Sequence, residues 1–123
     1  MKEKQSILVV DDEPSLRSAM VAQLKDQDYT VSSAEDGEVA IEMLHTQTFD
    51  LILLDLYMPK VDGFEVLKFA KKKHPKTKVV MMTGFADLNN ALGSKGLGAD
   101  HFIAKPFERQ ELLSVIHRVL RDV

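Results

Sequence analysis

Three aspartates follow apolar runs that lie far apart in the sequence. Asp11 and Asp12 come directly after ILVV at 7–10, and Asp55 comes directly after LILL at 51–54. A carboxylate at the rim of an apolar core is costly to hold there. If the two runs are neighbouring strands, they lie about 4.8 Å apart. The three carboxylates would then crowd one crevice, and their repulsion would raise the pKa of at least one of them unless a cation lies between them.

A hard cation suits this crevice. No histidine lies close to these aspartates in the sequence, and the chain contains no cysteine. One or two carboxylates, with water and a phosphate oxygen as further ligands, are typical of a Mg²⁺ site. We therefore predict that Mg²⁺ binds at Asp11, Asp12 and Asp55.

Two further polar residues come directly after apolar runs. Thr83 follows VVMM at 79–82, and Lys105 follows HFIA at 101–104. A lysine neutralises the peripheral oxygens of a phosphate, and a threonine donates a hydrogen bond to it. An aspartate can itself attack phosphorus and form an acyl phosphate. Such a role would explain why Asp55 is kept in an apolar setting.

Each of these residues has a simpler explanation when it is taken alone. An aspartate after a strand is usually a turn former, and DDE before Pro14 is by itself most often a helix cap. A single threonine or lysine at a strand end carries almost no information. The specific signal is the joint pattern, in which acids, a threonine and a lysine follow four different apolar runs.

The segments that must position these residues alternate between two kinds. The four apolar runs are apolar on both faces, which is typical of strands in a buried parallel sheet. A fifth segment, YTVSSA at 29–34, alternates and carries polar residues, as an edge strand does. Amphipathic segments separate the runs, so the sequence predicts five strand–helix units and an α/β, doubly wound parallel sheet. Ligands of such sheets bind beyond the carboxyl ends of the strands.

Helix boundaries are marked by caps, a proline and the spacing of apolar residues. We expect inward faces formed by Leu16, Met20 and Leu24, by Ala40, Met43 and Leu44, by Phe64, Leu67 and Ala70, and by Leu112, Ile116 and Val119. The four helices with these faces begin at Pro14, after Asp36, at Gly63 (ending at His74) and at Glu108 (ending at Arg121). A further helix is expected to begin after Asp87.

Size and composition fit one domain over residues 1–123. Hydrophobic residues make up 45% of the chain and charged residues 28%, and the net charge is −3. This charge argues against direct binding to nucleic acid or to an anionic membrane. The polar start MKEKQ and the short apolar run after it resemble neither an export signal nor a membrane span. We therefore expect a cytoplasmic protein.

Four motifs together, ILVVDDEP, LILLDLYMPKVDG, VVMMTGFAD and GADHFIAKPF, resemble the receiver domain of bacterial two-component response regulators. The similarity covers essentially the entire chain. It implies a flavodoxin-like (βα)5 fold with strand order 2-1-3-4-5. It also implies a signalling switch that promotes only its own phosphorylation and dephosphorylation and is not otherwise an enzyme.

The resemblance also implies the roles of the acids. Asp55 would accept a phosphoryl group from a phosphohistidine on a sensor histidine kinase or a phosphotransfer protein. Asp12, Asp55 and the main-chain carbonyl of Tyr57 would bind Mg²⁺ directly, and Asp11 would act mainly through water.

The same resemblance assigns the residues around the phosphoryl group. Thr83 and Lys105 would contact its oxygens, helped by the main-chain N–H groups of Tyr57 and Gly84. The Lys105–Pro106 peptide would be cis.

A conformational switch is implied as well. Thr83 would move toward the phosphoryl group, and Phe102 would swing inward. One surface would then change and control an output partner or domain, or form a homodimer. It consists of the helix after Asp87, the strand at 101–104 and the helix at 108–121. Sequence alone favours simple strand packing for Phe102. Because it lacks the hydroxyl of the tyrosine common at this place, we expect an inward bias even without phosphate.

Two features of this chain are unusual for the family. Gly93, Gly96 and Gly98 fall in or beside the helix expected after Asp87, and interior glycines weaken a helix by about 1 kcal/mol each. We therefore expect this helix to be short, frayed or displaced, although Gly98 fits a simple helix end.

The second unusual feature is a pair of aromatic residues. Tyr57 and Phe85 each lie two positions after a site residue, where the family tunes the attack of water on the acyl phosphate. We expect them to crowd that path and slow self-dephosphorylation.

Other functions remain open at this point. A Mg²⁺-dependent phosphohydrolase with an aspartate nucleophile would need a second acid as general acid and a substrate pocket, usually from a cap domain. A phosphorylation-independent interaction module would not need the set formed by Asp12, Asp55, Thr83 and Lys105. Leu113 and Leu120 could extend the core or help a dimer form. The basic group is expected to be a solvated surface; it consists of Lys68, Lys71–Lys73, Lys76 and Lys78.

Overall fold

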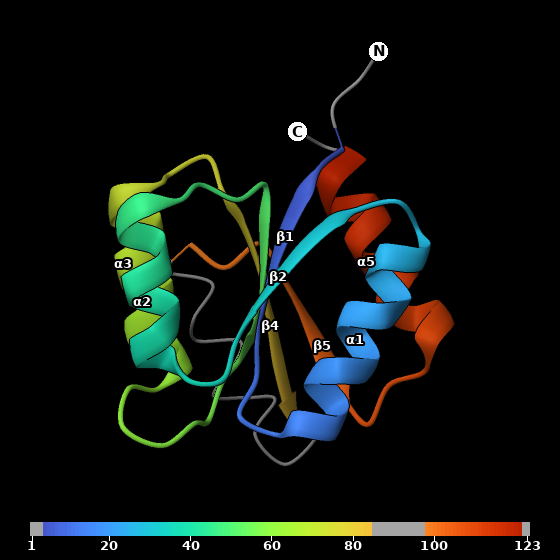
Figure 1. Cartoon of the computed structure of the whole chain (residues 1–123), viewed down its shortest axis with the longest axis horizontal. Helices are drawn as coiled ribbons and strands as arrows, with labels where there is room; N and C mark the ends of the chain where they lie inside the picture. The colour runs from blue at the N-terminus through green and yellow to red at the C-terminus, as the bar shows by residue number, and fades with distance from the viewer. Residues whose placement is uncertain (1–3, 85–97, 122–123) are drawn as a thin grey trace.

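The computed structural model describes residues 4–84 and 98–121. Strands and helices alternate as predicted from β1 to β4, and α5 follows β5 (Figure 1). The elements are β1 (Ser6–Val10), α1 (Pro14–Asp26), β2 (Thr30–Ala34), α2 (Gly37–Thr46), β3 (Leu51–Asp55), α3 (Gly63–Lys73), β4 (Lys78–Gly84), β5 (His101–Lys105) and α5 (Arg109–Arg121). The helix predicted after Asp87, with Gly93 and Gly96, lies outside the described residues. None of the described helices has the length and hydropathy needed to cross a membrane.

One parallel sheet forms the centre of the fold. Its strands follow the order β2-β1-β3-β4-β5, which is the order that the resemblance implied. At the carboxyl edge the register is set by pairs of Val10 with Leu54, Asp55 with Met82, and Thr83 with Ala104. The predicted site residues therefore leave neighbouring strands at similar levels of the same edge.

Helices cover both faces of the sheet, with α2 and α3 on one side and α1 and α5 on the other (Figure 1). Successive residues of a strand point to opposite faces. In β1, Leu8 and Val10 therefore join the apolar cluster beside α2 and α3, whereas Ile7 and Val9 join the cluster beside α1 and α5. This double burial explains why the strand sequences are apolar without alternation.

Local signals set the helix boundaries. The Asp36 side chain accepts a hydrogen bond of 2.9 Å from the N–H of Val39, which confirms the predicted cap of α2. Asp62 caps α3 in the same way, accepting from the N–H of Glu65 at 3.1 Å. Helix α5 begins at Arg109, one residue later than predicted. Side-chain capping thus fixes the two helices that follow β2 and β3.

The predicted inward faces are mostly buried, but three of their residues are only partly buried: Leu16 in α1, Met43 in α2 and Phe64 in α3. In α3 Val66, which the predicted face omits, is fully buried. Leu120 is buried in the cluster beside α1 and α5, and Leu113 is partly buried against it. Of the two alternatives for these leucines, the structure therefore supports extension of the core.

Two lysines of the basic group are not simply solvated, so that prediction is wrong for them. Lys71 Nζ donates to Asp100 Oδ2 at 2.8 Å and to the carbonyl of Thr77 at 2.6 Å. Asp100 Oδ2 also accepts from the N–H of Val79 at 2.8 Å, and Lys78 Nζ lies 3.8 Å from its Oδ1. We call Lys71, Asp100 and their two main-chain partners the Asp100 clamp.

Candidate functional site

The three predicted acids converge at the carboxyl edge of the sheet. Carboxylate oxygens of Asp11, Asp12 and Asp55 lie within 4.8 Å of one another. Strands β1 and β3 are direct neighbours, which brings the acids together across a sequence separation of more than 40 residues. Asp11 is fully buried and Asp55 is 7% exposed, whereas Asp12 is exposed. The predicted crowding of carboxylates is therefore confirmed.

Asp11 is held by several protein groups. Its Oδ1 accepts a hydrogen bond from the N–H of Glu13 at 2.9 Å, and its Oδ2 accepts one from Lys105 Nζ at 2.8 Å. Its main-chain carbonyl accepts a third from Arg17 Nη1 at 2.7 Å. Both carboxylate oxygens are thus engaged by the protein. Sequence reasoning missed Arg17, whose only signal is its place one turn into the helix after the acid pair.

Lys105 lies between two of the acids. Its Nζ is 2.8 Å from Asp11 Oδ2 and 3.4 Å from Asp55 Oδ2. Burial lowers the pKa of Lys105, but the hydrogen bond to Asp11 and the charges of Asp55 and Asp11 outweigh burial and raise the pKa overall. The side chain is therefore a firmly protonated cation. The Lys105–Pro106 peptide is cis, as the resemblance implied.

Asp55 has the most perturbed acidity of the site. Burial is the largest cause that raises the pKa of its carboxyl, and the charges of Asp11 and Asp12 add to it. Lys105 offsets part of this rise, and the net pKa is about 6. A carboxylate that ionises with difficulty in this setting favours the arrival of another cation. A bound metal ion would therefore stabilise the ionised form of Asp55.

The hydroxyl of Thr83 is buried and has no hydrogen-bond partner among the described residues. The residue is 2% exposed. In the described part of the chain, its Oγ1 is the single buried side-chain polar atom without a hydrogen-bond partner. Leaving such a group unsatisfied costs about 1–3 kcal/mol, so an unpartnered hydroxyl in a folded protein points to an absent ligand atom.

Taken together, the donors fit a hard cation beside an oxyanion. The carboxylates offer only oxygen ligands, as Mg²⁺ prefers. The Lys105 ammonium and the Thr83 hydroxyl offer hydrogen-bond donors to a second, negatively charged group. Gly84 ends β4 next to Thr83 and is partly buried. The structure thus brings Asp11, Asp12 and Asp55 together with Lys105, and Thr83 lies on β4, the strand that pairs with β3.

The aromatic residues of the prediction have different surroundings. Tyr57 is 49% exposed, a high value for a large hydrophobic side chain. Phe102 on β5 is partly buried and packs against the cluster beside α2 and α3; its inward bias stays a prediction. Phe85 lies outside the described residues.

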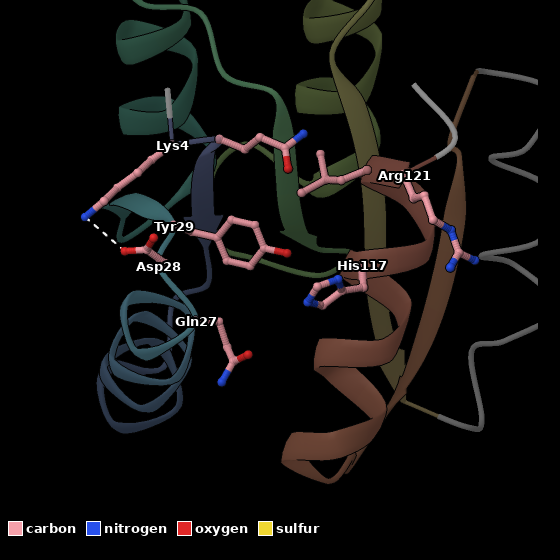
Figure 2. A pocket seen from close by; sticks show the side chains of 8 residues that line it. Lys4, Gln27, Asp28, Tyr29, His117 and Arg121 are labelled. Atoms are coloured by element: carbon pink, nitrogen blue, oxygen red, sulfur yellow. Dashed lines mark ion pairs between the residues drawn. The ribbon is translucent and has the colours of Figure 1, made fainter. Parts of the chain in front are cut away.

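A second hollow lies at the other end of the sheet. It has a volume of about 740 Å³ and is lined by residues before β1 and β2 and at the end of α5. Figure 2 shows Tyr29 and His117 facing this hollow, with ring centroids 6.2 Å apart, and Lys4 turned away to pair with Asp28 at 3.2 Å. Burial raises the pKa of Tyr29. The hollow lies far from the acids, so it has no part in their chemistry.

The chain is similar in sequence to known proteins. The profile of the response regulator receiver domain family matches residues 7–117. The probable transcriptional regulator ycf27 of Porphyridium aerugineum is 39% identical over 121 residues, which are 98% of this chain and 50% of that protein. The cell cycle response regulator CtrA of Brucella ovis is 30% identical over 115 residues, which are 94% of this chain and 50% of that protein. The chain spans about half the length of these curated relatives.

Solved structures agree. The receiver domain of NtrX from Brucella abortus superposes with a TM-score of 0.90 at 33% identity, covering 95% of this chain and 99% of that one. A CheY-like response regulator receiver domain protein from Methanospirillum hungatei superposes with a TM-score of 0.93 at 32% identity, covering 98% of this chain and 96% of that one.

Proposed function

The chain belongs to the response regulator receiver domain family, and on that premise we propose that it is a phosphorylation-dependent signalling switch with Asp55 as phosphoacceptor. The single observation that supports this role best is that an aspartate with a raised pKa lies in the same site as hydrogen-bond donors that could contact a phosphoryl group. Asp55 has a raised pKa and lies 3.4 Å from the Lys105 ammonium, and the Thr83 hydroxyl has no partner in the described part of the chain.

The transfer would proceed from a phosphohistidine on a sensor histidine kinase or a phosphotransfer protein. An Asp55 carboxylate oxygen attacks phosphorus, the new O–P bond forms, and the N–P bond breaks. The histidine leaves with the electron pair of that bond and takes up a proton. Hydrolysis reverses the state, because water attacks phosphorus and releases inorganic phosphate and the free carboxylate.

The metal would be held by Asp12, Asp55 and the main-chain carbonyl of Tyr57. Asp11 would act through water, which fits the engagement of both its oxygens by Glu13 and Lys105. When bound, Mg²⁺ supplies positive charge against the oxygens of the transferred group.

The donors around the phosphoryl group would be Thr83, Lys105 and the main-chain N–H groups of Tyr57 and Gly84. Lys105 would exchange its contact with Asp55 for one with a phosphoryl oxygen, and the buried hydroxyl of Thr83 would donate a hydrogen bond to another phosphoryl oxygen. Donors fixed before the reaction stabilise developing charge without reorganisation.

The same hydroxyl suggests how the switch operates. Thr83 would move toward the phosphoryl group, and Phe102 would move further inward into the space that is freed. The surface formed by β5, α5 and the segment between β4 and β5 would then change and control an output domain or partner, or a homodimer. Cytoplasmic location, single-domain organisation over 1–123 and the absence of direct nucleic-acid binding by this domain remain proposals.

Labelling tests the proposal directly. The protein is incubated with a small phosphodonor and Mg²⁺, and the mass of the intact chain is measured. We expect a stoichiometric gain of one phosphoryl group, lost on Asp55→Asn and retained in the control Asp26→Asn, which changes an exposed aspartate in α1. Turnover of an added phosphoester without labelling would favour a phosphohydrolase, and no reaction at all would favour an interaction module.

The lifetime of the phosphoryl group is a separate proposal. We expect Tyr57 and Phe85 to hinder the approach of water to phosphorus and keep the acyl phosphate long-lived. Tyr57→Asn and Phe85→Glu should each shorten that lifetime, measured by loss of label after the donor is removed. Unchanged lifetimes in both variants would remove the idea.

A further inference from the structure

The loop at residues 56–62 follows directly after Asp55 and is closed on itself. The N–H of Leu56 donates to the carbonyl of Met82 at 2.9 Å, which continues the pairing of β3 with β4. The N–H of Gly63 then donates back to the carbonyl of Leu56 at 2.8 Å. The first residue of the loop is therefore fixed to the sheet, and the loop closes back onto that residue. Tyr57, a proposed metal ligand, is the second residue of the loop.

The far corner of this loop rests on the first residue of α2. A Cβ atom added to Gly37 would lie 2.3 Å from the carbonyl oxygen of Val61 and 3.0 Å from its Cβ. The first distance is far below van der Waals contact, and the obstacle is main chain, which cannot rotate away. Glycine is needed here for close approach of two backbones, one of the uses for which only glycine serves.

The helix side of this contact is the stiffer one. Helix α2 is capped by Asp36 and carries the fully buried Ala40 and Leu44. The loop, in contrast, holds Lys60 at a φ of 69°, in the left-handed region, which disfavours residues with a Cβ. Pressure at the contact should therefore displace the loop and leave the helix in place.

We propose that Gly37 is a positioning residue for the divalent cation, acting through the loop of residues 56–62. This inference rests on the proposed function, because it assumes that the loop supplies the Tyr57 carbonyl to the metal. Residues that orient metal ligands typically change affinity by about 10- to 100-fold when they are altered. Gly37 touches neither the acids nor the metal, so its effect has to pass through the position of the loop.

Gly37→Ala tests the inference, with Glu38→Ala as the matched control on the next residue. Mg²⁺ is titrated into each metal-free protein, and the amide resonances of Leu56 and Tyr57 report the dissociation constant. We expect Gly37→Ala to weaken Mg²⁺ binding by about 10-fold or more and Glu38→Ala to leave it unchanged. Unfolding in EDTA is measured alongside, because a purely structural role would lower stability without changing affinity in the folded protein.

Val61→Gly provides a second variant that adds no bulk. It loosens the same contact from the loop side and should also weaken Mg²⁺ binding, by a smaller factor. If both variants bind Mg²⁺ like the parent, or if only resonances of Ala40 and Leu44 shift in Gly37→Ala, the inference is wrong. If the parent and Glu38→Ala themselves fail to bind Mg²⁺, the proposed function fails instead.

Discussion

Two lysine–aspartate pairs lie at opposite ends of β5 and have the same N–O distance of 2.8 Å. In the Asp100 clamp, at the amino end, the lysine also donates to a main-chain carbonyl and the aspartate accepts from a main-chain N–H. At the carboxyl end, Lys105 is shared between Asp11 and Asp55, and the hydroxyl of Thr83 has no partner among residues 4–84 and 98–121. The same N–O distance thus occurs in one cluster whose hydrogen-bonding groups all have partners and in one cluster where a hydroxyl lacks a partner among the described residues.

The difference lies in the balance of charge. The single carboxylate of Asp100 is near two lysines, Lys71 and Lys78. The single ammonium of Lys105 faces two acids, and Asp12 adds a third close by. A cluster with excess cation and filled hydrogen bonds stabilises the fold, whereas a cluster with excess anion is ready for a metal ion and a phosphoryl group.

The largest contrast should come from removing each lysine in turn. Lys105→Met removes a proposed donor to the transferred phosphoryl group, and the loss of one such donor slows a reaction by about 10²–10³-fold. Lys71→Met removes a lysine of the clamp and should leave the rate of the folded protein unchanged. The rate of labelling by a small phosphodonor is measured at saturating Mg²⁺. Equal rates in the two variants would erase the distinction between the pairs.

The pH dependence of stability should sharpen the contrast at the acid end. In EDTA, folded Asp55 has a pKa of about 6 against an ordinary value of 3.8. The folded state therefore holds the proton more tightly, and its ionisation weakens folding as pH rises from about 4 to 6. A shift of two pKa units corresponds to roughly 3 kcal/mol.

Asp55→Asn removes this titration. Near pH 4 we expect the unfolding free energies of the variant and the parent to differ little. Above pH 6 the variant should be the more stable protein, by up to roughly 3 kcal/mol. Urea unfolding in EDTA measures both. Saturating Mg²⁺ should reduce the difference, because the metal stabilises the charged carboxylate of the parent. A difference that does not grow with pH would contradict the raised pKa of Asp55.

The sequence predicts the cluster of acids at the carboxyl end of the sheet but does not predict the Asp100 clamp. Asp11, Asp55, Thr83 and Lys105 each follow an apolar run, and parallel strands must bring such positions to one edge. The convergence of the acids therefore follows from local pattern and fold class. The strand order itself came from the resemblance, because hydrophobic periodicity does not specify which strands are neighbours.

Contacts between elements without a shared pattern were not predictable. Lys71 and Asp100 are 29 residues apart and meet because the end of α3 packs near the start of β5, which no periodicity encodes. The basic group was assigned to solvent for the same reason. The contact of Gly37 with Val61 is equally hidden, since a glycine at the start of a helix usually has no special partner.

Breaking the clamp should affect stability and leave the chemistry intact. Asp100→Ala removes the acceptor for Lys71 and for the N–H of Val79, and hydrogen bonds to charged groups contribute about 1.5–3 kcal/mol. We expect the unfolding free energy to fall by about 2 kcal/mol in urea, while labelling of Asp55 continues. Asp100→Asn, which keeps an acceptor for Val79, should cost less. Loss of labelling in a folded Asp100→Ala protein would connect the two ends of β5.

The smallest effect separates the two lysines around Asp100. Lys78 Nζ lies 3.8 Å from Asp100 Oδ1, too far for a hydrogen bond, whereas Lys71 donates twice. A partly exposed ion pair without a hydrogen bond contributes about 0–1 kcal/mol. Lys78→Gln should therefore change the unfolding free energy by less than about 0.5 kcal/mol, and Lys71→Gln by clearly more. If Lys78→Gln were as destabilising as Lys71→Gln, net charge and not hydrogen bonding would hold the clamp together.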